Sequence, residues 1–120
     1  MAEFEEVGRE NWEEFINSPK AVLMLGKTDC PSCVAFAEEL TAFCEEGAGD
    51  WEDVRFGKLI INQPGLAKFK KQNTWLADVR DLPYTLIYAD GEIEKKFLGG
   101  GIDRLTNRLE RVFGEEQSIY

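Results

Sequence analysis

The 120-residue sequence suits one domain spanning 1–120, which is long enough to bury a core and too short for two ordinary domains. Hydrophobic residues at 43% and charged residues at 31% are typical of a soluble globular protein, and a net charge of −9 argues against nucleic acid or membrane partners. Because histidine is absent, Cys-His and Ser-His catalysis and His-ligated metal sites are excluded.

The expected compartment follows from the same composition. The opening MAEFEEVGRE is acidic and unlike a signal peptide, and no apolar run approaches the roughly 18 residues that cross a bilayer. We therefore expect a cytoplasmic protein. Three cysteines in a reducing compartment do not form a disulfide framework, which favours catalytic or redox use.

The first half of the chain predicts a helix, a strand and a second helix. Residues 9–18 space apolar side chains as one helical face, and Pro19 helps to end that helix. Residues 21–26 (AVLMLG) are apolar throughout and predict a strand that is covered on both faces. Residues 30–46 carry a helical stripe formed by Cys33, Ala37, Leu40 and Cys44.

The second half predicts a strand, a helix, a hairpin and a last helix. Residues 53–65 form a strand followed by a turn, and residues 66–79 form a helix with a short basic cluster. Residues 83–98 form a hairpin around the Asp90–Gly91 turn, and residues 102–116 form the final helix. The order (β)αβαβαββα predicts an α/β fold whose mixed sheet has helices on both faces.

The sequence TDCPSC places two cysteines between a strand and a helix. This spacing suits a redox couple, because one thiolate attacks a substrate disulfide and the second then reaches the first to close a disulfide. The helix N-terminus favours a thiolate at Cys30, and Pro31 suits the first helical turn. We expect Cys30 to be exposed and to attack, and Cys33 to be more buried and to resolve.

The cysteine pair has two other interpretations. The thiols could be unreactive packing residues. They could also belong to a zinc site, but Cys44 offers only a third sulfur and no histidine completes four ligands, so we predict no metal. Cys44 lies on the same helical stripe and is expected to be part of the core.

The chain resembles the thioredoxin family along nearly its whole length. CPSC after a buried strand, then KLIINQPG, DLPYTLIYADGE and FLGGG, follow the order of that family's active-site motif, third strand, cis-proline loop, hairpin and late glycine. The resemblance implies a thioredoxin fold and a protein-disulfide reductase whose catalytic residues are Cys30 and Cys33. It further implies disulfide-containing protein substrates, a reductase as electron donor, no cofactor and a monomer.

The resemblance also implies which residues surround the cysteine pair. Pro83 matches the cis-proline, which presents the backbone of Leu82 to an extended substrate; the alternative is an ordinary trans proline at a strand start. The predicted substrate-binding set is Asp29, Pro31, Ser32, Leu82, Pro83 and Gly99.

Several positions depart from the family pattern. Met24 stands where thioredoxins usually carry a buried aspartate, and Asp29 and Gly26 stand at positions that are usually aromatic. A carboxylate at Asp29 disfavours the Cys30 thiolate. Lys58 matches the family's strand lysine, and its ammonium either favours a thiolate at Cys33, as a modulating residue, or simply reaches solvent.

Two other functional classes stay open. The proline after the first cysteine and the GGID sequence at residues 100–103 are also similar to glutaredoxins, where such residues help to bind glutathione, although Asp103 equally suits a helix start. A non-catalytic binding module of the same fold would tolerate the departures. The stretch 69–83 is longer than usual, so that a recognition element with Trp75 as an anchor, or only a longer packed helix, is expected near the site.

Overall fold

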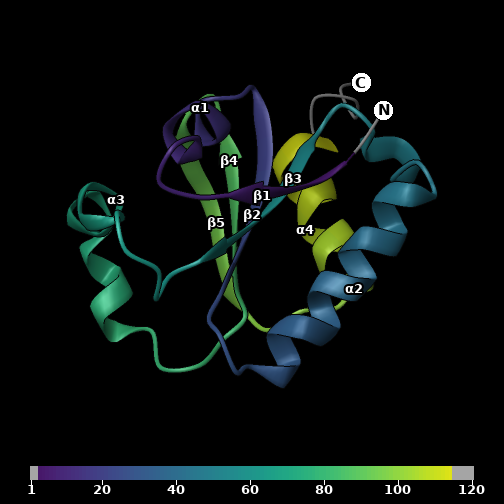
Figure 1. Cartoon of the computed structure of the whole chain (residues 1–120). Coiled ribbons are helices and arrows are strands. Elements are labelled where there is room, and N and C mark those ends of the chain that lie inside the picture. The colour runs from purple at the N-terminus through teal and green to yellow at the C-terminus, as the bar shows by residue number, and fades with distance from the viewer. Residues whose placement is uncertain (1–2, 115–120) are drawn as a thin grey trace.

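The computed structural model describes residues 3–114. The helices are α1 (Trp12–Ile16), α2 (Pro31–Glu45), α3 (Ala67–Gln72) and α4 (Ile102–Phe113), with short 3-10 helices η1 (Gly49–Trp51) and η2 (Thr74–Asp78). The strands are β1 (Phe4–Val7), β2 (Lys20–Gly26), β3 (Arg55–Ile60), β4 (Tyr84–Ala89) and β5 (Glu92–Leu98) (Figure 1).

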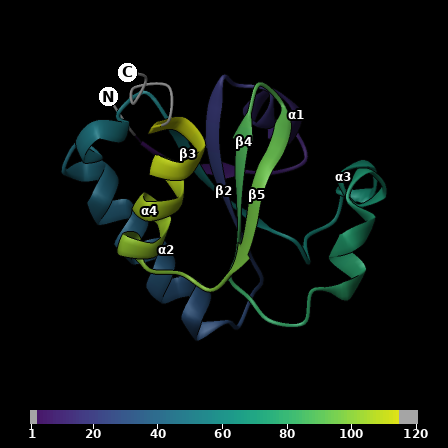
Figure 2. The ribbon, with the colours of Figure 1, turned by 180° about the vertical axis from the view of Figure 1, so that it is seen from behind.

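The five strands form one mixed sheet in the order β1-β3-β2-β4-β5. The β1–β3 and β3–β2 pairs are parallel, whereas β2–β4 and β4–β5 are antiparallel. Helices α2 and α4 lie on one face of the sheet and α1 and α3 on the other, as Figures 1 and 2 show from opposite sides. The predicted mixed sheet with helices on both faces is confirmed, and no helix within residues 3–114 is long and apolar enough to cross a membrane.

The central strand β2 explains why residues 21–26 are apolar without alternation. Val22 and Met24 enter the core on the α2 and α4 side, and Leu23 and Leu25 enter the core on the α1 and α3 side. All four side chains have no exposed surface. A strand that is covered on both faces gains from apolar side chains at every position.

The prediction of one continuous helix over residues 66–79 is wrong, because the segment forms two short helices. Helix α3 ends at Gln72, and η2 begins at Thr74. Asn73 separates them with a non-helical backbone (φ −127°, ψ 65°), and its side-chain amide donates a hydrogen bond of 2.8 Å to the carbonyl of Phe69. A short polar side chain that bonds its own backbone competes with the helix and ends it here. The last predicted helix is found from Ile102 to Phe113, while 115 and 116 lie outside the described residues.

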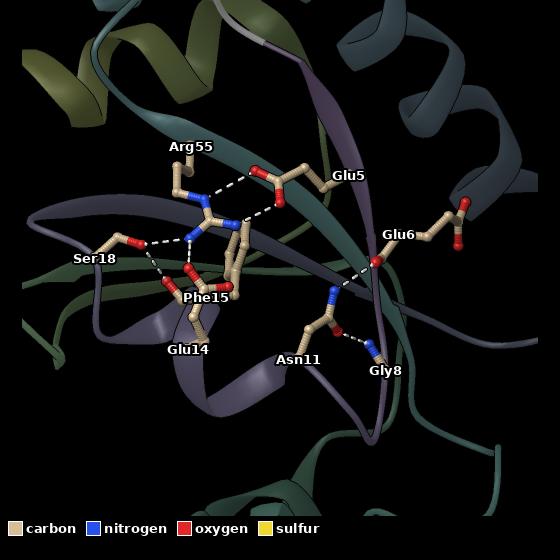
Figure 3. A network of polar contacts seen from close by, with 8 residues as sticks. All are labelled: Glu5, Glu6, Gly8, Asn11, Glu14, Phe15, Ser18 and Arg55. Atoms are coloured by element: carbon tan, nitrogen blue, oxygen red, sulfur yellow. Dashed lines mark hydrogen bonds and ion pairs between the residues drawn. The ribbon is translucent and has the colours of Figure 1, made fainter.

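The end of the sheet remote from the cysteine pair is held by an ionic network centred on Arg55, the first residue of β3 (Figure 3). Its guanidinium donates two hydrogen bonds to Glu5, of 2.9 and 2.6 Å, and others to Glu14 and Ser18. The hydrogen bonds to Glu5 and Glu14 raise the pKa of Arg55 above its ordinary value. The network therefore ties β1, α1 and β3 together. The two parallel hydrogen bonds between Arg55 and Glu5 link charged groups, and such bonds are stronger than hydrogen bonds between neutral groups.

Candidate active site

Cys30 and Cys33 lie at the junction between β2 and α2, at the end of the sheet opposite Arg55. A disulfide joins them, with 5.2 Å between their Cα atoms. Cys30 is the N-cap residue of α2, its Sγ accepts a 3.2 Å hydrogen bond from the backbone N–H of Cys33, and Pro31 occupies the first turn. The first turn of α2 contains no acidic residue, so the positive end of the helix faces Cys30 without a carboxylate inside the helix to balance it.

The prediction that Cys30 is exposed is wrong. Cys30 is 7% exposed and Cys33 is 3% exposed, so both sulfurs are buried and the expected difference is small. The reason is that Sγ of Cys30 lies 3.9 Å from the carbonyl oxygen of Leu82, whose side chain packs against the core on both faces of the sheet. The loop before β4 thus covers the sulfur, which helix geometry alone would leave open.

The loop that carries Asp29 is anchored by a residue that the sequence patterns did not single out. Asn62 accepts a 3.2 Å hydrogen bond from the backbone N–H of Thr28, and its amide donates to the hydroxyl of Thr28 over 2.8 Å. Asp29 is exposed and takes a left-handed backbone (φ 59°) directly before Cys30. One feature of the sequence could have pointed to Asn62, which is a polar residue just after β3. Because β2 and β3 are parallel and end at the same edge of the sheet, Asn62 lies close to the loop that follows β2.

The Leu82–Pro83 peptide bond is cis, the geometry that the resemblance implies. Pro83 is buried, and its carbonyl accepts a 2.8 Å hydrogen bond from the backbone N–H of Gly99. Gly99 has φ +92°, a backbone region that favours glycine. The structure thus joins Leu82, Pro83 and Gly99 into one rim beside Cys30, while Pro31 and Ser32 are exposed in the first turn of α2.

The floor beneath Cys33 is apolar. A methyl group at Gly26 would lie 3.3 Å from Sγ of Cys33 and 3.3 Å from Cε of Met24, so these three residues are in close contact. Met24 itself has no exposed surface. Where the resemblance to thioredoxins leads one to expect a buried carboxylate, this chain places a thioether, which offers no general base to Cys33.

Lys58 pairs with β1 rather than with the cysteines. Its ammonium lies 3.2 Å from the carboxylate of Glu6, and a quarter of its side chain is exposed. Because Glu6 balances much of that charge, an effect of Lys58 on Cys33 stays a prediction.

Two further residues that the sequence patterns singled out are Cys44 and Asp103. Cys44 is a free, buried thiol, which confirms its place in the core, and burial raises its pKa to about 11. Asp103 is exposed in the first turn of α4, as the helix-start interpretation predicts.

Comparison with known proteins identifies the fold. Thioredoxin f from spinach chloroplast (long form) superposes with a TM-score of 0.73 at 21% identity, covering 91% of this chain and 85% of its own. Thioredoxin f2 of Chlamydomonas reinhardtii (TM-score 0.71, 18% identity) covers 92% of this chain and 96% of its own. Oxidised thioredoxin O2 of Arabidopsis thaliana (TM-score 0.69, 16% identity) covers 92% of this chain and 94% of its own. No protein-family model and no curated protein sequence matches the chain. The chain has the thioredoxin fold.

Proposed function

We propose that this protein is a thiol–disulfide oxidoreductase that reduces protein disulfides through Cys30 and Cys33. One observation carries the proposal: Cys30 caps α2, accepts the N–H of Cys33 at 3.2 Å and already forms a disulfide with Cys33. In the reduced protein the same N–H and the helix N-terminus would stabilise a thiolate at Cys30. A thiolate that is stabilised in this position is the nucleophile that disulfide exchange requires.

The reaction proceeds in two exchanges. The Cys30 thiolate attacks one sulfur of the substrate disulfide, which forms a mixed disulfide and releases the other substrate sulfur as a thiolate. The thiolate of Cys33 then attacks Sγ of Cys30, which closes the Cys30–Cys33 disulfide and releases the second substrate thiolate. Two electrons pass from the cysteine pair to the substrate, and the released thiolates take up protons from solvent.

The assignment of Cys30 as the attacking residue rests on its surroundings. Cys30 caps the N-terminus of α2 and its sulfur lies 3.9 Å from the carbonyl oxygen of Leu82, in the loop that would hold the substrate, whereas Cys33 contacts Gly26 and the apolar floor. Leu82 and Pro83 would position an extended substrate segment. We also assign Asp29, Pro31, Ser32 and Gly99 to the substrate-binding surface, and the first three of these residues are exposed next to Cys30 in the sequence.

A reductase must return the oxidised pair to the dithiol. One similar protein of known structure, thioredoxin f2, was solved in complex with ferredoxin:thioredoxin reductase, which supports a reductase donor for this chain. A dithiol that works as a reductant needs a reducing compartment, for which we propose the cytoplasm. We further propose that the chain acts as a single domain and as a monomer.

Reduction of insulin by dithiothreitol tests the proposal. The parent protein should accelerate precipitation of the insulin chains, whereas a non-catalytic binding module would give the rate of dithiothreitol alone. Cys33→Ser should accumulate the mixed disulfide with substrate, Cys30→Ser should form little of it, and Cys44→Ser should match the parent. Equal capture by Cys30→Ser and Cys33→Ser would reverse the assignment of roles.

A further inference from the structure

A mostly apolar pocket of about 370 Å³ opens on the α3 side of the sheet, next to the cis-proline loop. We call it the Trp75 pocket. Its apolar walls are Trp75, Val79, Tyr84 and Leu98, and its charged rim is Asp78, Arg80 and Asp81. None of these residues belongs to the catalytic rim described above.

The pocket adjoins the reactive sulfur through the backbone. Asp81 and Tyr84 directly flank Leu82 and Pro83, and the carbonyl of Leu82 lies 3.9 Å from Sγ of Cys30. An extended peptide advances about 3.3 Å per residue, so a substrate that lies along this loop reaches the pocket within about three residues of the attacked cysteine.

One residue of the apolar wall, Leu98, is exposed to solvent. Leu98 is 47% exposed and lies opposite Tyr84 in the β4–β5 register. Within residues 3–114, only Leu98 and Val34 are exposed large hydrophobic side chains, and Val34 directly follows Cys33. Contiguous exposed apolar surface marks binding sites, and Leu98 continues the apolar wall of the pocket, whereas Val34 does not line it.

Trp75 is held in place by two neighbouring side chains. Its ring lies 5.7 Å from the ring of Tyr84, and the ammonium of Lys96 lies 4.7 Å from the indole centroid. The break at Asn73 turns the chain into η2, the 3-10 helix that carries Trp75. The pocket is therefore formed in advance, which lowers the entropy cost of placing a ligand side chain there.

We propose that the Trp75 pocket receives a large apolar or aromatic side chain of the substrate polypeptide, within three residues of the cysteine that Cys30 attacks. This inference rests on the proposed disulfide reduction and names its substrate class. The rim carries two carboxylates (Asp78 and Asp81) and one guanidinium (Arg80), none of which makes an ion pair within residues 3–114. Because two of these three charges are negative and the protein carries a net charge of −9, neutral or basic flanking residues fit better than acidic ones.

A set of disulfide-bridged peptides tests the proposal. Tyr or Ser is placed at each of the three positions on either side of one cysteine, and hydroxyethyl disulfide, which has no side chain, normalises every rate. At one or more positions, Tyr should raise kcat/KM about fivefold over Ser in the parent protein, in line with partial burial of an apolar side chain. Trp75→Ala and Leu98→Ala should each bring that ratio below about twofold.

Val34→Ala is the matched control, because it trims the other exposed apolar side chain, which does not line the pocket, and it should keep the parent's ratio. If Trp75→Ala unfolds, Leu98→Ala, which changes an exposed residue, carries the test alone. Two results would overturn the inference: no preference for Tyr over Ser at any position, or a Tyr/Ser ratio of kcat/KM in Leu98→Ala equal to that of the parent. If hydroxyethyl disulfide is still reduced in that case, the proposed disulfide reduction stands. A parent protein that reduces no disulfide at all would remove both.

Discussion

Replacing Gly100 by alanine should destabilise the protein by crowding the helix that carries the active site. Gly100 lies between β5 and α4, and a methyl group there would lie 2.5 Å from Cγ of Phe36 and 2.8 and 2.9 Å from its two Cδ atoms. Phe36 is only 2% exposed and lies three residues after Cys33 in α2. A buried aromatic ring has no open space to turn into, so α2 or the loop must shift.

The expected cost follows from that overlap. Overpacking a well-filled core lowers the free energy of unfolding by about 1–3 kcal/mol. For a chain of 120 residues this corresponds to a fall in Tm of about 4–12 °C. Urea unfolding of the oxidised protein, followed by tryptophan fluorescence, and thermal unfolding by circular dichroism both measure it.

A double-mutant cycle shows whether contact with Phe36 is the cause. Phe36→Leu removes part of the ring, so the double variant should be at least about 1 kcal/mol more stable than the two single costs predict. Gly101→Ala is the control: Gly101 has φ +111° and no heavy atom lies within 4 Å of the new methyl, so its cost comes from the backbone. That cost should add to Phe36→Leu within about 0.5 kcal/mol. Gly100→Ala at the parent's stability, or simple additivity with Phe36→Leu, would refute the packing argument.

Three other outcomes are expected. Burial raises the pKa of Cys44 to about 11, so only about one thousandth of the Cys44 thiol is ionised at pH 8. Mass spectrometry should therefore find Cys44 alkylated by iodoacetamide only after denaturation, and rapid labelling of the folded protein would contradict this. Arg55→Met should lower the free energy of unfolding by about 1–3 kcal/mol, because Glu5 loses both hydrogen bonds. The exposed Lys27→Met should cost far less, and equal losses would show that the network contributes little. Asp29→Asn should let reduced Cys30 react with iodoacetamide at lower pH than the parent, since a repelling charge is removed, whereas the remote Asp50→Asn should not; an unchanged pH profile would dismiss Asp29 as a modulator.

The sequence by itself determined the order and type of most elements. The uninterrupted apolar run at 21–26 and the helical stripe at 30–46 are local periodic patterns, and each reports which faces of its own element are buried. Asp90–Gly91 similarly marked the hairpin turn, where both residues have positive φ. The spacing of CPSC, between a strand and a helix, favoured a redox couple, and the structure confirms the disulfide between Cys30 and Cys33.

The surroundings of that pair were decided only by tertiary structure. Burial of Cys30 depends on Leu82, 52 positions along the chain, and the Thr28 loop depends on Asn62, 34 positions away. The split at Asn73 depended on a side-chain hydrogen bond that competed with helix propensity, and it placed Trp75 against Tyr84. Periodicity assigns a residue to a face, but which residues of distant segments meet across that face depends on how the elements pack, and that information is not local in the sequence.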